Sequence, residues 1–321
     1  MVRRMTVRGG SDVDGVHKTV EELAELTLNR GLLGVNRDDL ILWFKHHNYY
    51  RFLGYAKTFM RDPKYGDKNF IAGTRFDAIT GLMESDSDLR SAILSLIFPV
   101  ERILRTSYAR IAYDELESKN DPHRDHAFYL DPHRYRRNDE WDDGEADRLV
   151  DDIIRDLSRS RDVNVTKFFN RSATVPDYRY ANVPVWAAVE AMSFGRISRI
   201  LELSLDQDVA RGIAAEYSLQ WDRFCSDVHA ICDLRNRCAH HDQLWNRQCP
   251  SPARRIDRYT KYSHWRPCGG SAQMTIMTVY RFRKGMGLPD AERATIEQML
   301  ENDETFRNGI LNPNWHPRQH A

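Results

Sequence analysis

Residues 219–246 read LQWDRFCSDVHAICDLRNRCAHHDQLWN, and the first part of this stretch has the spacing of an amphipathic helix. Apolar side chains recur every three or four positions along it. They are Trp221, Phe224, Cys225, Val228, Ile231 and Cys232. With a turn of about 100° per residue, these side chains form one stripe centred near Val228. The pattern predicts a helix over residues 219–239 that buries this stripe against other helices.

Arg235 interrupts the apolar stripe. It falls only about 20° from the centre of the stripe, where the pattern requires an aliphatic side chain. A guanidinium in such a place is costly unless it is paired or faces a ligand or a wet interface. The functional interpretation is a ligand-facing arginine. The structural interpretation is an ion pair with a core carboxylate such as Glu101 or Glu190.

Polar side chains follow Arg235 at the end of the same helix. In a continuous helix His240 would lie about 140° away from Arg235. The two groups therefore meet only if the helix unwinds before His240, or if two copies of the chain pair about a two-fold axis. Asn236 is the i,i+4 neighbour of His240 and Asp233 lies on the same face, so both could orient the imidazole. Alternatively, Asp233 pairs with Arg237.

The rest of the chain is dominated by helical patterns. Strand-like alternation with hairpin turns is almost absent, which predicts an all-α fold. An interruption is expected near Ser85–Ser87, a loop over 61–73, and a helix end at Gly195. Further helices are predicted over residues 16–30, 36–55, 74–119, 144–159, 164–171, 184–195, 271–284 and 290–301.

The composition argues against a disordered or membrane-spanning chain. The 321 residues are 41% hydrophobic and 29% charged, with a mean hydropathy of −0.64. The most apolar stretch, Ser91–Val100, has about ten residues, whereas a bilayer requires about 20. No apolar segment follows the basic N-terminus, so a cytoplasmic location is expected. Lys+Arg and Asp+Glu both total 47, and any polyanion site must therefore be local.

Metal binding is not expected from the cysteines. Their number is odd, no CxxC is present, and their spacing to His240 and His241 suits no standard zinc ligand set. We expect reduced thiols and neither a metal nor another cofactor. The five cysteines are Cys225, Cys232, Cys238, Cys249 and Cys268.

Five ordered blocks resemble one known family. The sequence RNRCAH (235–240) matches the Arg-polar-x₃-His motif of HEPN domains, and the blocks as a set are similar to Abi-like abortive-infection proteins of the AbiD and AbiF type. The blocks are NYYRFLGYAKTF (48–59), GTRFDAITGL (73–82) with SDLR (87–90), ERILR (101–105), PVWAAVEAMSFG (184–195) and LRNRCAHHDQLWN (234–246).

The resemblance implies a HEPN-like helical bundle with additional N- and C-terminal helices. The expected division is an N-terminal helical region (1–72), the HEPN-like domain (73–250), and a basic loop with C-terminal helices (251–321). The resemblance also implies a homodimeric, metal-independent endoribonuclease of phage defence or of a toxin–antitoxin system. The alternative is a HEPN-like module that binds RNA or protein without cleaving it.

The resemblance assigns roles at the motif. His240 would act as general acid or base, Arg235 would stabilise the phosphorane, and Asn236 would orient the histidine or the phosphate. His241 is either a second proton carrier, an RNA contact or a solvent-facing side chain. Some HEPN toxins carry a nucleotidylated tyrosine two residues after the histidine. Here this residue is Asp242, so that control is not expected. In relatives of the AbiF type a small structured RNA can act as antitoxin, so the resemblance is compatible with a small RNA antitoxin.

Two further sets of residues are weaker candidates. Glu101 and Arg105 have i,i+4 spacing, which favours an intrahelical ion pair, although they could also line the cleft. Cationic and aromatic side chains are interspersed over residues 247–266, as in surfaces that bind single-stranded RNA. The alternative interpretation of this segment is a solvated loop. The RNA-binding candidates are Arg247, Arg254, Arg255, Arg258, Tyr259, Lys261 and Tyr262.

Overall fold

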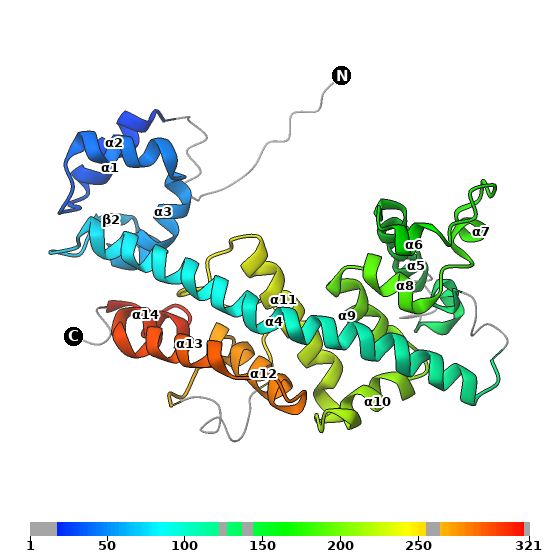
Figure 1. Ribbon diagram of the computed structural model, residues 1–321. Helices are drawn as coiled ribbons and strands as arrows, with labels where there is room; N and C mark the ends of the chain where they lie inside the picture. The colour runs from blue at the N-terminus through cyan, green and yellow to red at the C-terminus, as the bar shows by residue number, and fades with distance from the viewer. Residues whose placement is uncertain (1–17, 122–126, 137–143, 255–263, 318–321) are drawn as a thin grey trace. The chain divides into compact units, whose positions relative to one another are not determined.

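The all-α prediction is confirmed. The computed structural model describes residues 18–121, 127–136, 144–254 and 264–317, and these contain fourteen α-helices and one two-stranded hairpin (Figure 1). They form two compact units, one of residues 18–83 with 316–317 and one of the described residues between Glu84 and Trp315. Among the described residues, no helix is both long enough and apolar enough to span a bilayer.

The first unit contains three short helices and the hairpin. The helices are α1 (Val20–Asn29), α2 (Arg37–His46) and α3 (Tyr49–Ala56), each preceded by a side-chain cap. The hairpin consists of β1 (Met60–Asp62) and β2 (Asp67–Phe70), with Gly66 at φ +97° in the turn. The prediction of a plain loop over 61–73 was therefore wrong. Strands of three and four residues are too short to show an alternating pattern.

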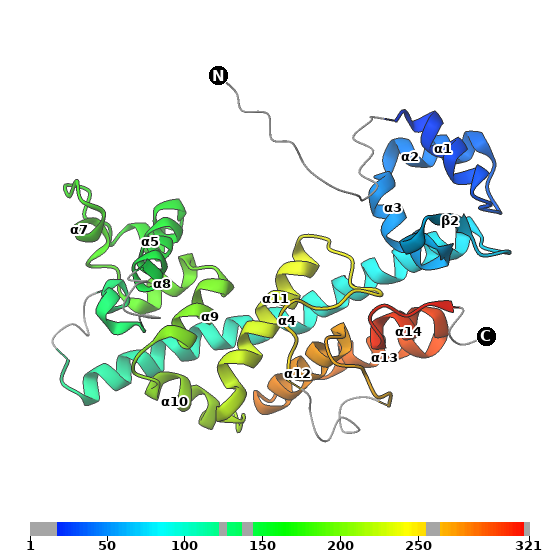
Figure 2. The same ribbon diagram turned by 180° about the vertical axis from the view of Figure 1, so that it is seen from behind.

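The second unit is arranged along α4 (Phe76–Ser118), most of which belongs to it. Figures 1 and 2 show α5–α10 around the later part of α4, α12–α14 along the earlier part, and α11 between the two groups. The other helices are α5 (Gly144–Arg159), α6 (Val163–Thr166), α7 (Pro176–Tyr180), α8 (Val185–Ala191), α9 (Phe194–Leu203), α10 (Asp208–Glu216), α11 (Phe224–Ala239), α12 (Ala272–Gly285), α13 (Ala291–Asn302) and α14 (Glu304–Leu311).

Helix α4 passes through Ser85–Ser87 without a break, so the predicted interruption was wrong. Ser and Asp favour caps and turns when their side chains bond to nearby backbone. Asp86 does not act in this way. Its side chain is fully buried and pairs with Arg90, one turn later on the same helix, at 2.6 Å. Ser and Asp at these positions do favour a helix break, but here the Asp86 carboxylate is held by an arginine of the same helix.

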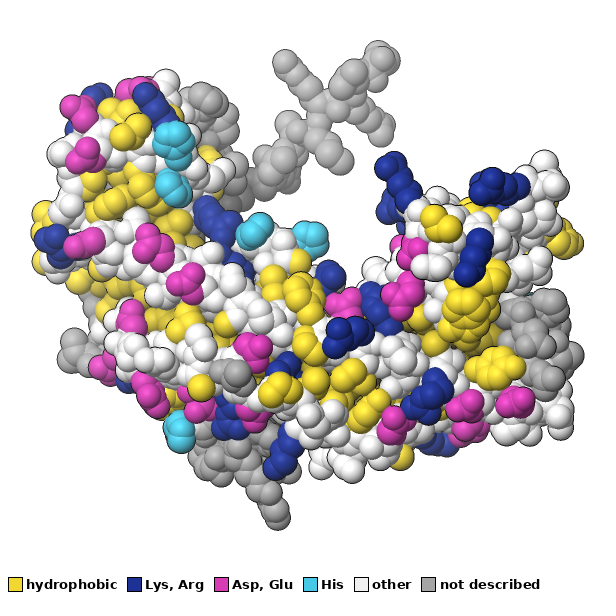
Figure 3. Space-filling model, viewed as in Figure 1, with side chains coloured by type: hydrophobic (Ala, Val, Ile, Leu, Met, Phe, Trp, Pro, Cys, Tyr) yellow, Lys and Arg dark blue, Asp and Glu magenta, His cyan; other side chains and the backbone are white. Residues whose placement is uncertain are grey.

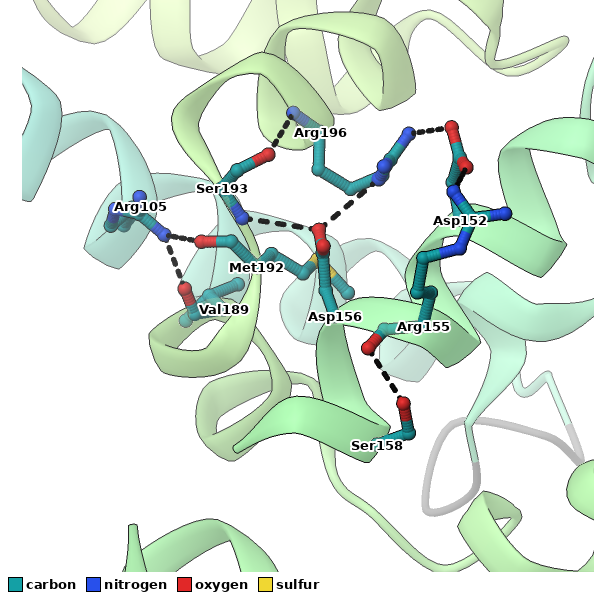
Figure 4. A network of polar contacts seen from close by, with 9 residues as sticks. All are labelled: Arg105, Asp152, Arg155, Asp156, Ser158, Val189, Met192, Ser193 and Arg196. Carbon is teal, nitrogen blue, oxygen red and sulfur yellow. Dashed lines mark hydrogen bonds and ion pairs between the residues drawn. The ribbon is translucent and has the colours of Figure 1, made fainter. Parts of the chain in front are cut away.

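The predicted helix over 184–195 is two helices. Helix α8 ends at Ala191, and Ser193 caps α9 by accepting a hydrogen bond from the Arg196 N–H. The Ser193 N–H donates to Asp156 of α5, which also pairs with the Arg196 side chain (Figure 4). Gly195 therefore lies in the first turn of α9 and does not end a helix.

Helix α11 forms the centre of the second unit, where it packs against α9 and α12. Phe224, Val228 and Ile231 of its predicted apolar stripe are fully buried. The segment after α11 packs on α14. Trp245 is buried, and its indole N–H donates to the Thr305 carbonyl.

Gly309 of α14 allows this close approach. A Cβ placed on Gly309 would lie 2.2 Å from Nε1 of Trp245, so Gly309→Ala should lower the free energy of unfolding by about 1–3 kcal/mol. Denaturation by urea measures the change. Gly195→Ala is the matched control in the same unit, since its Cβ would meet only Cys232 Sγ at 3.7 Å and Ser193 Oγ at 3.9 Å, both ordinary contacts. Equal midpoints for the two variants would contradict the close packing of Gly309 on Trp245.

Candidate active site

Helix α11 ends in a Schellman motif that presents two histidines. The Asp242 N–H donates to the Arg237 carbonyl at 2.8 Å, and the His241 N–H donates to the Cys238 carbonyl at 3.2 Å. His240 is the C-cap and His241 adopts a left-handed conformation with φ 60°. Both side chains are exposed, and Figure 3 shows histidine side chains at the surface over this end of α11. The sequence left open whether the helix ends before His240 or continues through it. In the structure the helix ends at Ala239.

A buried ion pair on α4 holds the segment that follows the histidines. The Asp86 carboxylate accepts hydrogen bonds from the Leu244 N–H at 3.1 Å and from the Trp245 N–H at 3.0 Å. Arg90, the ion-pair partner of Asp86, donates to the Asp242 carbonyl at 3.3 Å. The turn that carries His240 and His241 is therefore fixed from α4 through its backbone.

Arg90 belongs to the family-like SDLR block, but the Asp86–Arg90 pair was not predicted from the sequence. Asp and Arg at i,i+4 on an apolar helix face were the available signal. Their partners lie more than 150 residues away in the chain, as the separations of 152, 158 and 159 residues show. No local pattern predicts contacts of that kind.

Glu101 joins Arg235 to Arg105. Arg235 Nε donates to Glu101 Oε2 at 3.2 Å, and Arg105 Nη2 donates to Glu101 Oε1 at 2.6 Å. The structure thus contains the ion pair between Arg235 and Glu101 that the structural interpretation of Arg235 predicts. Glu190, the other candidate partner, is exposed.

The Arg235 side chain nevertheless remains 30% exposed, compared with 10% for Glu101. Its Nη1 donates to Asn236 Oδ1 at 3.2 Å, and within the described part of the chain its Nη2 makes no hydrogen bond. The guanidinium is therefore anchored through Nε while its outer edge stays open to an incoming anion.

Arg105 connects this group to the turn between α8 and α9. Its Nη1 donates to the carbonyls of Val189 and Met192, both at 2.5 Å (Figure 4). The Arg105 side chain is only 14% exposed. Its three hydrogen-bond acceptors make it a structural support of Glu101, and the i,i+4 pair predicted from the sequence is present.

Asn236 and Asp233 form no hydrogen bond or ion pair with the His240 side chain. Asn236 uses its oxygen for Arg235 and its amide nitrogen for Cys232 Sγ at 3.6 Å. Burial raises the pKa of Asp233, while the neighbouring Arg237 and His229 and the Ser251 N–H oppose that rise. No side-chain hydrogen bond or ion pair joins Arg235 to His240 among the described residues.

The predicted RNA-binding segment is described only in part. Arg247 and Arg254 are exposed, and Arg247 donates to Gln243 Oε1 at 3.3 Å. The Arg254 carbonyl accepts a hydrogen bond from Arg223. The remaining candidates lie outside the described residues. They are Arg255, Arg258, Tyr259, Lys261 and Tyr262.

The cysteines near the histidines are buried thiols. Burial raises the pKa of Cys232 to about 11 and that of Cys238 to about 12. Where the chain is described, no group of three or more His, Cys, Asp or Glu side chains is arranged to hold a metal ion.

The family of the chain follows from a comparison with known families. The model for the family described as Abi-like protein matches residues 42–246, a range that includes Asp86, Glu101, Arg235 and His240. Since this is more than half of the sequence, the chain belongs to the Abi-like protein family. Membership implies a part in abortive infection, a form of phage defence. No curated protein and no solved structure matches the chain.

Proposed function

We propose that the chain is a metal-independent HEPN-type endoribonuclease of abortive infection or of a toxin–antitoxin system. The observation that carries the proposal is Arg235, a guanidinium anchored by Glu101 whose outer edge is open, on the same helix end as two exposed histidines. A planar fork of this kind suits a phosphate. Histidine is the side chain that most often moves protons near neutral pH.

The chemistry needs one proton removed and one supplied. The 2′-hydroxyl attacks the adjacent phosphorus and loses its proton to a base, while the bond from phosphorus to the 5′-oxygen breaks and that oxygen gains a proton. The products are a 2′,3′-cyclic phosphate and a 5′-hydroxyl end. Arg235 stabilises the additional negative charge of the phosphorane through its open edge.

The two proton transfers favour a homodimer. His240 of one copy and His240 of the second copy would act as base and acid at one cleft, each beside an Arg235. The absence of a bond from Arg235 to His240 within one chain is consistent with sites completed by two copies. A small RNA that binds the same cleft would act as antitoxin.

Cleavage of a labelled single-stranded RNA in excess chelator tests the proposed function. We expect cyclic phosphate at the new 3′ ends and hydroxyl at the new 5′ ends, and a rate about 10²–10³-fold lower for Arg235→Ala. Arg211→Ala is the matched control, because Arg211 is an exposed arginine of the same unit that pairs with Asp208 outside the motif. Absence of cleavage would favour the non-catalytic module, and 5′-phosphate products or dependence on added metal would exclude the mechanism.

A further inference from the structure

The segment around α6–α8 carries an unusual surface of cations and exposed aromatics. Residues 159–186 contain five Arg or Lys and only two acids, although the whole chain has no net charge. All five cations are exposed, and none forms an ion pair with a carboxylate within the described residues. They are Arg159, Arg161, Lys167, Arg171 and Arg179.

The neighbouring arginines behave differently. Arg196 pairs with Asp152 and Asp156 (Figure 4), and Arg199 pairs with Glu145 and Glu202. Acids of α5 and α9 thus pair with the arginines of α9 but not with the five cations of the 159–186 segment. The lack of ion pairs among the described residues is therefore specific to this segment. A surface segment in which cations outnumber acids raises the local concentration of polyanions.

Aromatic side chains lie among these cations. Trp186 is 54% exposed, and its ring meets the Phe168 ring edge-on at 5.2 Å. Lys167 Nζ lies 5.1 Å from the centre of Phe168 and 6.0 Å from the centre of Trp186. Figure 3 shows Lys and Arg side chains next to apolar side chains over α6–α8.

A backbone contact places two of the other cations, Arg171 and Arg179, near one another. The Asn170 N–H donates to the Arg179 carbonyl at 2.9 Å, which places the residue next to Arg171 beside Arg179. Tyr178, the neighbour of Arg179, is 70% exposed. The surface therefore combines the exposed aromatic rings of Tyr178 and Trp186 with three exposed cations, Lys167, Arg171 and Arg179, that form no ion pair within the described residues.

Helix α8 connects this surface to the candidate active site. It carries Trp186 in its first turn, and the carbonyls that bind Arg105 belong to Val189 and Met192 at its other end. With a rise of about 1.5 Å per residue, Trp186 and Met192 are separated by about 9 Å along the helix axis. Arg105 in turn holds Glu101, the anchor of Arg235.

We propose that Lys167, Arg171, Arg179 and Trp186 form a binding surface for single-stranded RNA. The cations neutralise phosphates, and Trp186 stacks on a base. Stacking requires an unpaired base, whereas the bases of a duplex are covered by their neighbours. The biological role as a substrate-binding surface rests on the proposed ribonuclease function, but binding itself does not.

Equilibrium binding to a fluorescent 2′-O-methyl RNA of 20 nucleotides tests the surface. The methylated 2′-oxygen cannot attack, so the result does not depend on cleavage. Trp186→Ala should weaken binding about tenfold, and Trp186→Phe should retain most of the affinity because a ring face remains. Each phosphate contact contributes about 0.7 to the slope of log K against log salt concentration. Replacing Lys167, Arg171 and Arg179 by alanine removes three such contacts and should therefore lower the magnitude of this slope by about 2.

Trp221→Ala is the matched control. Trp221 is also exposed, at 38%, with the Arg211 guanidinium 5.1 Å from its ring centre, but Arg211 is paired with Asp208. This variant should bind as the wild type does. Unchanged affinity and salt slope in the Trp186 and triple variants would overturn the proposed surface, even if the protein cleaves RNA. Equal binding of a duplex of the same length would also overturn it.

Discussion

Replacing His240 by alanine should lower the rate of RNA cleavage by a factor of about 10²–10⁴, the usual contribution of a positioned general acid or base. The side chain is exposed at the C-cap of α11 and makes no hydrogen bond within the described residues. Its removal should therefore leave the stability unchanged. Initial rates in excess chelator, together with the urea midpoint, separate the loss of chemistry from a loss of folding.

His241→Ala is the matched control for that experiment. His241 is the next residue and is also exposed on the same turn. It differs from His240 in its left-handed backbone conformation. We expect less than a tenfold change in rate for this variant. A wild-type rate for His240→Ala would remove the mechanism, whereas equal losses at both positions would make His241 the second proton carrier.

Replacing Asp86 by alanine should destabilise the second unit by about 3–5 kcal/mol. The change leaves the Arg90 guanidinium, only 4% exposed, without its carboxylate, and it leaves the N–H groups of Leu244 and Trp245 without an acceptor. Urea denaturation measures the loss. Cleavage should fall as well, because the histidine turn loses its support from α4.

Asp114→Ala is the matched control on the same helix. Asp114 also has an arginine partner at i,i+4 spacing, Arg110, but the pair is exposed and its atoms are 3.9 Å apart. Its removal should change the stability by less than about 0.5 kcal/mol. The double variant Asp86→Leu with Arg90→Leu should recover only part of the loss, because the two N–H groups remain unpaired. Full recovery would mean that only the buried charge matters.

Long periodic segments were the most predictable part of the fold. The helix predicted over 144–159 is α5 with the same bounds, and those predicted over 271–284 and 290–301 are α12 and α13 to within one residue. Helices α9, α10 and α14, each of eight to ten residues, were not predicted. In short helices, caps and tertiary contacts decide the bounds more than periodicity does.

The candidate site was predictable from the sequence only in part. The position of Arg235 on the stripe indicated an unusual arginine, and Glu101 was one of two partners considered for it. The roles of Asn236 and Asp233 toward His240 rested on helical spacing. In the structure their side chains turn to Arg235, Cys232 and the Ser251 backbone instead.

The packing of α14 on the residues after α11 affects when the site can form during synthesis. The Asn246 N–H donates to the Gly309 carbonyl, and the Asn246 side chain donates to the Trp315 carbonyl. A nascent chain that has just emerged with α11 lacks these acceptors. The histidine turn therefore gains its full support only after the ribosome has added about seventy further residues, so the candidate site is completed late in synthesis.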